Sequence, residues 1–219
     1  MDEPVDSLGE LEENLRDIAR ANRWFGGIAP LAREIERLGA QSMLDVGCGG
    51  ADVPRALVQR ARRRPSTLKI TCLDRSEQML TLARRGAGSD PALEFVRADG
   101  TALPYDDSSF DLAMCSLVLH HLAPEEAVAL LREMRRVGRL TPLVCDLRRS
   151  LTAYVATLGF VRMTTRNRLT RHDGPLSVRR AYTPSEALEL ARRAGWKAPA
   201  VLVLPWFRML LVDRAREPR

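Results

Sequence analysis

Strand-like and helix-like segments alternate along the middle of this chain, and that alternation limits the fold more than any other feature of its 219 residues. Short apolar runs of the kind found in buried strands are expected at 42–46, 69–73, 94–97, 110–117 and 140–146. Amphipathic helices are expected at 51–63, 76–85 and 124–136. A chain that returns through a helix after most of its strands builds a parallel sheet covered on both faces, so we predict an α/β fold.

The segments on either side of this region are predicted to be mainly helical. The capping-box spacing of Ser7 and Glu10 predicts a helix that ends at the paired glycines Gly26-Gly27. The other expected segments are a helix at 30–39, a basic helical stretch at 149–168, a polar loop at 171–175, a helix at 184–194, and strands at 200–204 and 208–213. Only 205–207 separate the last two strands, so these strands are expected to pair as an antiparallel hairpin. No repeat or linker is visible, which predicts one domain.

Composition narrows the class of protein. Hydrophobic residues make up 45% of the chain, but no apolar run approaches the roughly 20 residues that span a bilayer, so we expect no membrane contact. The acidic start lacks an apolar signal core. The cysteines Cys48, Cys72, Cys115 and Cys145 lie too far apart to form a metal-binding pair, so we expect buried free thiols, no metal and a cytoplasmic location.

The excess of positive charge is concentrated in one segment of the sequence. The net charge is +6, and residues 139–180 contain nine arginines against two acidic residues. This excess marks either a solvated face or a face for an anionic ligand or polar substrate, and both interpretations stay open.

A glycine loop follows the first strand, in the run Asp45-Val46-Gly47-Cys48-Gly49-Gly50. A Gly-x-Gly turn at this place lets the backbone approach a nucleotide-like ligand at the carboxyl edge of the sheet. The dinucleotide fingerprint requires a small residue where this chain has Asp52, and a carboxylate there repels a pyrophosphate. Asp45 also repels a pyrophosphate, but it suits a ligand that carries an ammonium and a sulfonium, as S-adenosylmethionine does.

Two further aspartates stand at the ends of the next strands. Asp74 is placed to accept two hydrogen bonds from a ribose diol, and Asp99 to accept one from an adenine amino group, with Gly100 allowing close approach. A single aspartate at a strand end is usually a cap or turn residue, but three with a glycine loop indicate a site.

These motifs resemble those of the class I S-adenosylmethionine-dependent methyltransferases. The resemblance covers about residues 40–146, through the glycine loop and the runs 73–80, 97–100 and 103–111. The run 103–111, with Ser116-Leu117-Val118-Leu119-His120-His121-Leu122, is most similar to the ubiquinone/menaquinone-biosynthesis and natural-product methyltransferases. The chain departs from the family at Ala51, where a third glycine is usual, and at 135–140, which replaces a Lys-Pro-Gly-Gly turn.

The resemblance implies a Rossmann-like, mostly parallel seven-stranded sheet with helices on both faces and the antiparallel hairpin at its C-terminal end. It divides the chain into an N-terminal helical lid at 1–40, a cofactor-binding core at 41–146, a substrate-side insertion at 147–183, and the C-terminal helix and hairpin at 184–219. We expect S-adenosylmethionine, with S-adenosylhomocysteine as product, to contact Asp45, Gly47, Cys48, Gly49, Asp74, Arg75, Met79, Ala98, Asp99, Gly100, Cys115 and Ser116.

Residues for the methyl acceptor are expected beyond the fourth and fifth strands. His121 and His120 are candidates for a general base, with His121 preferred, as is His172 in the predicted loop beside Asp173. The alternative is that these histidines cap a helix, pack or face solvent. Arg148 and Arg149 are candidates to bind an acceptor oxygen, or else a solvated helix start.

Trp24 is expected to line the lid together with Phe25, unless both simply pack. The expected acceptor is a small phenol, quinone-like, polyketide-like or carboxylate molecule methylated on oxygen or carbon. The sequence leaves the oligomeric state open.

Two rival functions are weighed. A nucleic-acid methyltransferase that methylates base amino groups usually has an Asn/Asp-Pro-Pro-Tyr/Phe turn after the fourth strand, where this chain reads Cys115-Ser116-Leu117-Val118, so we expect no nucleic-acid partner. A non-catalytic S-adenosylmethionine-binding protein stays open, because no obligatory catalytic residue exists to be missing.

Overall fold

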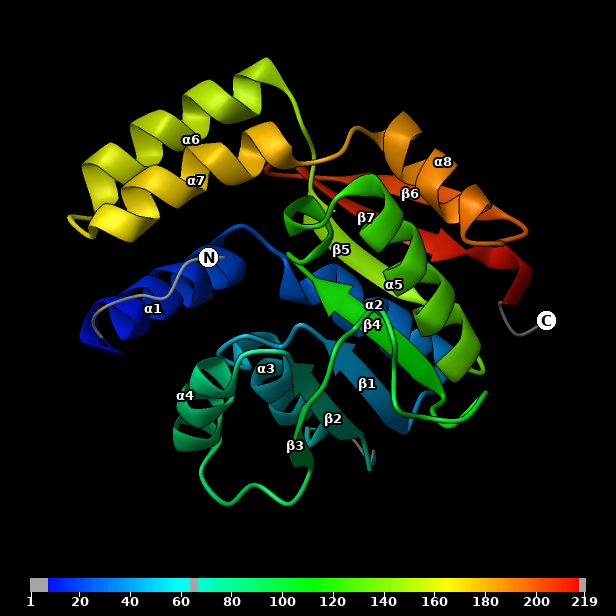
Figure 1. Cartoon of the computed structure of the whole chain (residues 1–219). Coiled ribbons are helices and arrows are strands. Elements are labelled where there is room, and N and C mark those ends of the chain that lie inside the picture. The colour runs from blue at the N-terminus through cyan, green and yellow to red at the C-terminus, as the bar shows by residue number, and fades with distance from the viewer. Residues whose placement is uncertain (1–7, 64–66, 217–219) are drawn as a thin grey trace.

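The computed structural model describes residues 8–63 and 67–216, and it is built around a seven-stranded sheet (Figure 1). The strand order is β3-β2-β1-β4-β5-β7-β6. The strands are β1 (Ser42–Val46), β2 (Lys69–Asp74), β3 (Leu93–Arg97), β4 (Leu112–Ser116), β5 (Leu143–Leu147), β6 (Pro199–Leu204) and β7 (Arg208–Asp213). The first five strands pair in parallel, and β7 pairs antiparallel with both β5 and β6. The predicted fold class is confirmed, hairpin included.

Alternating side chains of the strands build a core on each face of the sheet. Met43 belongs to the hydrophobic cluster against which helices α2 (Ile28–Leu38), α3 (Asp52–Ala61) and α4 (Glu77–Ala87) pack. Its neighbour Leu44 belongs to the other cluster, which receives α5 (Pro124–Val137) and α8 (Pro184–Arg193). Both faces are therefore covered, which explains why these strands are continuously apolar in sequence.

The remaining helices lie across the carboxyl edge of the parallel strands. Helix α1 (Leu8–Trp24) lies between α3 and α4 on one side and a helical hairpin, α6 (Leu151–Thr164) and α7 (Arg168–Arg180), on the other (Figure 1). Leu11 and Leu15 of α1 pack against Met79 and Leu82 of α4. We call α1, α6 and α7 together the helical cap. Two short 3-10 turns, η1 (Leu119–His121) and η2 (Arg214–Arg216), complete the described chain.

The N-terminal boundaries differ in detail from the expected ones. Ser7, the expected cap of the first helix, lies outside the described residues. The second helix begins at Ile28, two residues earlier than expected, and its buried side chains cover the sheet. Of the two N-terminal helices, only α1 reaches the carboxyl edge.

The predicted polar loop at 171–175 is wrong, because these residues lie inside α7. Asn167 starts this helix by accepting a hydrogen bond from the Thr170 N–H at 3.0 Å. An added Cβ at Gly174 would lie 3.2 Å from Val161 of α6, so the glycine allows two helices to pack closely. Pro175 is buried in the same contact region. The Gly-Pro pair, a turn signal in sequence, here serves helix–helix packing.

Candidate functional site

A cavity of about 840 Å³ opens at the carboxyl edge of the sheet. It lies where the strand order reverses, between β1 and β4, which is the usual ligand crevice of an open α/β sheet. Residues of the helical cap and of the 205–207 turn between β6 and β7 also line it. The volume suits a nucleoside-sized ligand together with a second small molecule.

The glycine loop presents its backbone to this cavity. The N–H groups of Gly47 and Cys48 both donate to the Leu73 carbonyl, at 2.7 and 2.9 Å, which turns the chain sharply at the end of β1. Gly49 has a φ of +52°, and a Cβ added there would meet no atom within 4 Å. Ala51 takes the same left-handed conformation, with a φ of 54°. The glycine-to-alanine departure therefore keeps the loop conformation at some cost in backbone strain.

Asp45 is a buried carboxyl group that lines the cavity. It is 2% exposed, and its Oδ1 atom has no hydrogen-bond partner among the described residues. Burial, together with the neighbouring carboxylates of Asp52 and Asp74, raises the pKa of Asp45 well above its ordinary value. An orphaned carboxyl oxygen of this kind fits a ligand that brings a positive charge or a hydrogen-bond donor.

Asp74 and Asp99 are held in fixed orientations by their neighbours. Asp74 accepts hydrogen bonds from the Gly49 and Ser76 N–H groups, each at 2.9 Å, which leaves lone pairs on both oxygens. Asp99 accepts from the Thr101 N–H at 2.8 Å and from its hydroxyl at 2.7 Å, and these bonds lower the pKa of Asp99. Both carboxylates are therefore oriented to receive donors from a nucleoside.

Nearly all the residues predicted for the cofactor line this one cavity. They are Asp45, Gly47, Cys48, Gly49, Asp74, Arg75, Met79, Ala98, Asp99, Gly100 and Ser116. Cys115 does not line it, because its side chain is fully buried in the sheet. The residues present fit S-adenosylmethionine, since the buried Asp45 carboxyl suits one of its positive groups. Ser116 Oγ is a second buried atom without a hydrogen-bond partner among the described residues.

A histidine–aspartate pair stands at the other side of the cavity. His120 Nδ1 lies 2.6 Å from Asp146 Oδ1, and the two side chains are 3% and 1% exposed. Burial alone would raise the pKa of Asp146, but the charge and hydrogen bond of His120 lower it below its ordinary value. Because a carboxylate accepts the Nδ1 proton, the other ring nitrogen, Nε2, is the one that accepts a proton.

The sequence preferred His121 over His120, whereas the geometry favours His120. The His121 ring stacks on that of His120 with centroids 4.2 Å apart, and both rings line the cavity. His120 is oriented by a hydrogen bond to a buried carboxylate, Asp146, at the end of β5. The two histidines are adjacent in the single turn η1, so sequence spacing alone does not distinguish them.

Three other predicted residues lie outside the cavity. His172 is on α7 with its side chain 76% exposed, and Asp173 rather than His172 lines the cavity. Arg149 forms an ion pair with Glu186. Arg148 is half-buried, its N–H donates to the Phe207 carbonyl, and its side chain is not part of the lining. The structure thus brings none of these three into the lining of the cavity. His172 lies on an exposed part of α7, and Arg149 is paired with α8.

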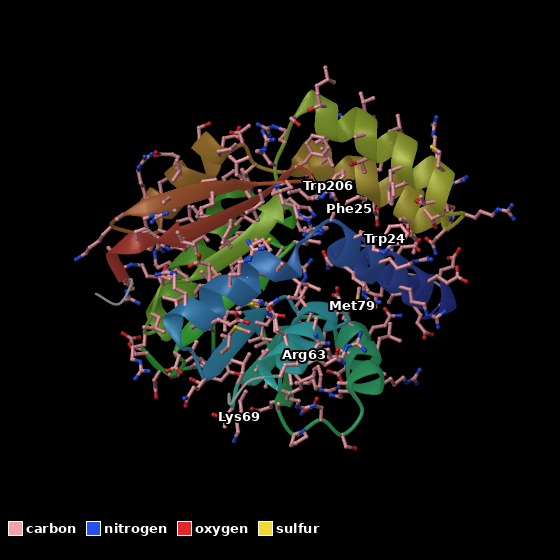
Figure 2. All side chains as sticks on the ribbon, turned by 180° about the vertical axis from the view of Figure 1, so that it is seen from behind. Trp24, Phe25, Arg63, Lys69, Met79 and Trp206 are labelled. Atoms are coloured by element: carbon pink, nitrogen blue, oxygen red, sulfur yellow. The ribbon has the colours of Figure 1, made fainter. Side chains whose placement is uncertain are left out.

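Aromatic side chains form the mouth of the cavity. Phe25 packs edge-on against Phe160 of α6 at 4.9 Å and against Trp206 at 5.4 Å. Figure 2 shows Trp24 and Phe25 at the end of α1 beside Trp206 of the β6–β7 turn. Trp206 and Phe207 both have a positive φ, 58° and 59°, a conformation that usually selects asparagine and glycine. Trp24 lines the cavity and is 66% exposed.

The helical cap is held together by polar contacts that the sequence did not predict. Asp17 of α1 accepts hydrogen bonds from the hydroxyls of Thr165, at 2.6 Å, and Thr170, at 3.0 Å. The Asn14 amide donates to the Thr170 hydroxyl at 3.1 Å. The only available signal was the polar face of the first helix.

A buried arginine was also missed. Arg208 is the first residue of β7 and lines the cavity, and it donates from Nη2 to Asn22 Oδ1 at 2.7 Å. The Asn22 amide in turn donates to Asp52 Oδ2 at 2.8 Å. An arginine at the first position of a strand belongs to no sequence pattern that would identify it as a ligand-binding residue.

Neither a metal centre nor a membrane span is found in residues 8–63 and 67–216. No group of histidine, cysteine, aspartate and glutamate side chains there is arranged to hold a metal ion. No helix in the same residues is long and apolar enough to cross a bilayer. The four cysteines are buried free thiols, as predicted.

Comparison with known proteins agrees with this geometry. Residues 43–140 match the family described as "Methyltransferase domain". A demethylmenaquinone methyltransferase of Clavibacter sepedonicus is 31% identical over 135 residues, which are 58% of this chain and 53% of that protein. The chain thus spans about half the length of that relative. Methyltransferase GfsG of Streptomyces halstedii is 29% identical, with 97% of this chain and 83% of GfsG covered.

A solved structure shares the fold at low identity. It is a SAM-dependent methyltransferase from Aquifex aeolicus, with a TM-score of 0.68 at 15% identity over 92% of this chain and 96% of that one. The shared fold therefore extends beyond the 43–140 segment that matches the family.

Proposed function

Because this chain belongs to the class I S-adenosylmethionine-dependent methyltransferases, we propose that it transfers a methyl group from that cofactor to a hydroxyl-bearing small molecule. One observation carries the proposal. A single cavity has an acidic, glycine-lined compartment on one side and the His120–Asp146 pair on the other. The bound cofactor supplies an activated methyl group on a sulfonium, so the protein's task is to align, to exclude water and to remove a proton.

Each of these tasks is assigned to particular residues of the chain. Asp45 faces the positive charge, and Asp74 and Asp99 hold the nucleoside. His120 accepts a proton at Nε2 from the acceptor hydroxyl, and Asp146 stabilises the imidazolium that forms. The helical cap encloses the reaction, and the aromatic mouth supports an apolar or ring-bearing acceptor.

Several features support a small acceptor over a nucleic acid. Residues of α1, α6 and α7 line the cavity beside the cofactor compartment. The demethylmenaquinone methyltransferase that the chain resembles is named for a quinone-type substrate. The buried free thiols support a cytoplasmic location.

Two measurements test the proposal. S-adenosylhomocysteine should raise the melting temperature while NAD should not, because only the first ligand matches the acidic compartment. Methyl-labelled cofactor should then label an aromatic or aliphatic alcohol from a panel, and His120→Ala should abolish labelling while S-adenosylhomocysteine still binds. Equal thermal shifts with both ligands contradict the cofactor, and unchanged labelling in His120→Ala contradicts the base.

A further inference from the structure

Arg208 is a buried cation whose role the proposed function leaves open. It is 3% exposed and lines the cavity. Its Nη2 donates to an uncharged group, Asn22, and its Nη1 is buried without a hydrogen-bond partner among the described residues. A buried guanidinium with an unused donor is costly unless a ligand completes its hydrogen bonds.

The other arginines that line the cavity differ from Arg208 because they are exposed. Arg20 is exposed at 65% and pairs with Asp17 on the same helix. Arg75 is also exposed, and its charge helps to lower the pKa of Asp99, after the two hydrogen bonds from Thr101. Within the described part of the chain, Arg208 is therefore the buried arginine of the cavity.

The surroundings of Arg208 place it near the glycine loop. A chain of hydrogen bonds runs from Arg208 through Asn22 to Asp52, the first residue of α3. An added Cβ at Gly27 would lie 2.7 Å from Arg208 Nη1, so this glycine leaves room for the guanidinium. The cation is thus fixed beside the compartment that also holds Asp45.

We propose that Arg208 binds the carboxylate of the amino-acid part of S-adenosylmethionine. This assignment rests on the proposed function. The cofactor carries two positive groups and one carboxylate. Asp45 matches a positive group, and Asp74 and Asp99 are assigned to the nucleoside, so none of the three aspartates matches the carboxylate. A guanidinium has the fork of donors that a carboxylate needs, and Asn22 holds that fork in place.

The experiment compares two ligands that differ in the carboxylate alone. S-adenosylhomocysteine and its decarboxylated analogue S-adenosyl-3-thiopropylamine are titrated by calorimetry into wild type, Arg208→Gln and Arg208→Lys. Arg208→Gln should bind S-adenosylhomocysteine on the order of tenfold to a hundredfold more weakly, with the analogue changed by less than about twofold. Arg208→Lys keeps the buried charge and should show a smaller selective loss.

Arg216→Gln is the matched control, since Arg216 is a partly buried arginine that bonds the Arg135 and Gly138 carbonyls. It should change neither affinity. The proposal is overturned if Arg208→Gln weakens both ligands equally, which marks a structural role, or if neither weakens. It is also overturned if Arg20→Gln shows the selective loss instead.

If Arg208→Gln does not fold, an unchanged affinity ratio in Arg208→Lys overturns the assignment. A wild type that binds neither ligand contradicts the proposed function itself, and this assignment with it.

Discussion

Replacing Gly47 by alanine should destabilise the protein more than the same change at Gly49. Both glycines have a positive φ, 76° and 52°, so alanine costs about 1–2 kcal/mol at either position from backbone strain. Only at Gly47 does the added Cβ collide, since it would lie 2.5 Å from Val118 Cγ2. Forcing a methyl group into a filled space costs roughly 1–3 kcal/mol more.

Urea unfolding followed by circular dichroism measures both costs. The double variant Gly47→Ala/Val118→Ala separates them, because without Val118 Cγ2 the added methyl should cost only the backbone strain. We therefore expect a coupling energy of about 1–3 kcal/mol between positions 47 and 118. Equal costs for Gly47→Ala and Gly49→Ala, or strict additivity in the double variant, would refute the reasoning.

Three further outcomes are expected. Asp45 has a raised pKa, so a cationic ligand should bind more tightly as pH rises through that pKa, and proton release measured by calorimetry in two buffers should vanish in Asp45→Asn. Asp74→Ala should weaken S-adenosylhomocysteine roughly tenfold to a hundredfold in the same assay, and an unchanged affinity would show the ribose contact to be misassigned. Asp146 has a lowered pKa, so its contribution to stability is present above the ordinary aspartate pKa and lost as pH falls below it. The stability gap between wild type and Asp146→Asn, measured by urea unfolding, should therefore narrow on acidification, and a gap independent of pH would contradict this.

The sequence predicts the sheet and the cofactor compartment well for a simple physical reason. Strands buried on both faces must be continuously apolar, and a backbone turn that approaches a ligand must contain glycine. Both features are therefore recognisable as local sequence patterns. Asp74 and Asp99 are recognisable because they stand where such strands end.

The residues on the acceptor side of the cavity have no comparable local sequence pattern. His120 depends on Asp146, which is 26 positions away, and the choice between His120 and His121 depends on how one 3-10 turn is oriented. Gly174 and Pro175 look like a loop until the neighbouring helix is known. These contacts arise only when distant segments meet, which composition and spacing do not encode.

The reversed direction of β7 determines which parts of the sequence build the cavity. Running antiparallel to β5, β7 brings its first residue, Arg208, and the turn before it to the edge where β5 ends. Trp206 and Arg208 therefore reach the cavity, and Asp146 reaches His120 of its lining, from outside 43–140, the segment that matches the methyltransferase-domain family. The segment 43–140 alone therefore lacks both the arginine that we assign to the cofactor carboxylate and one of the aromatic residues at the mouth of the cavity.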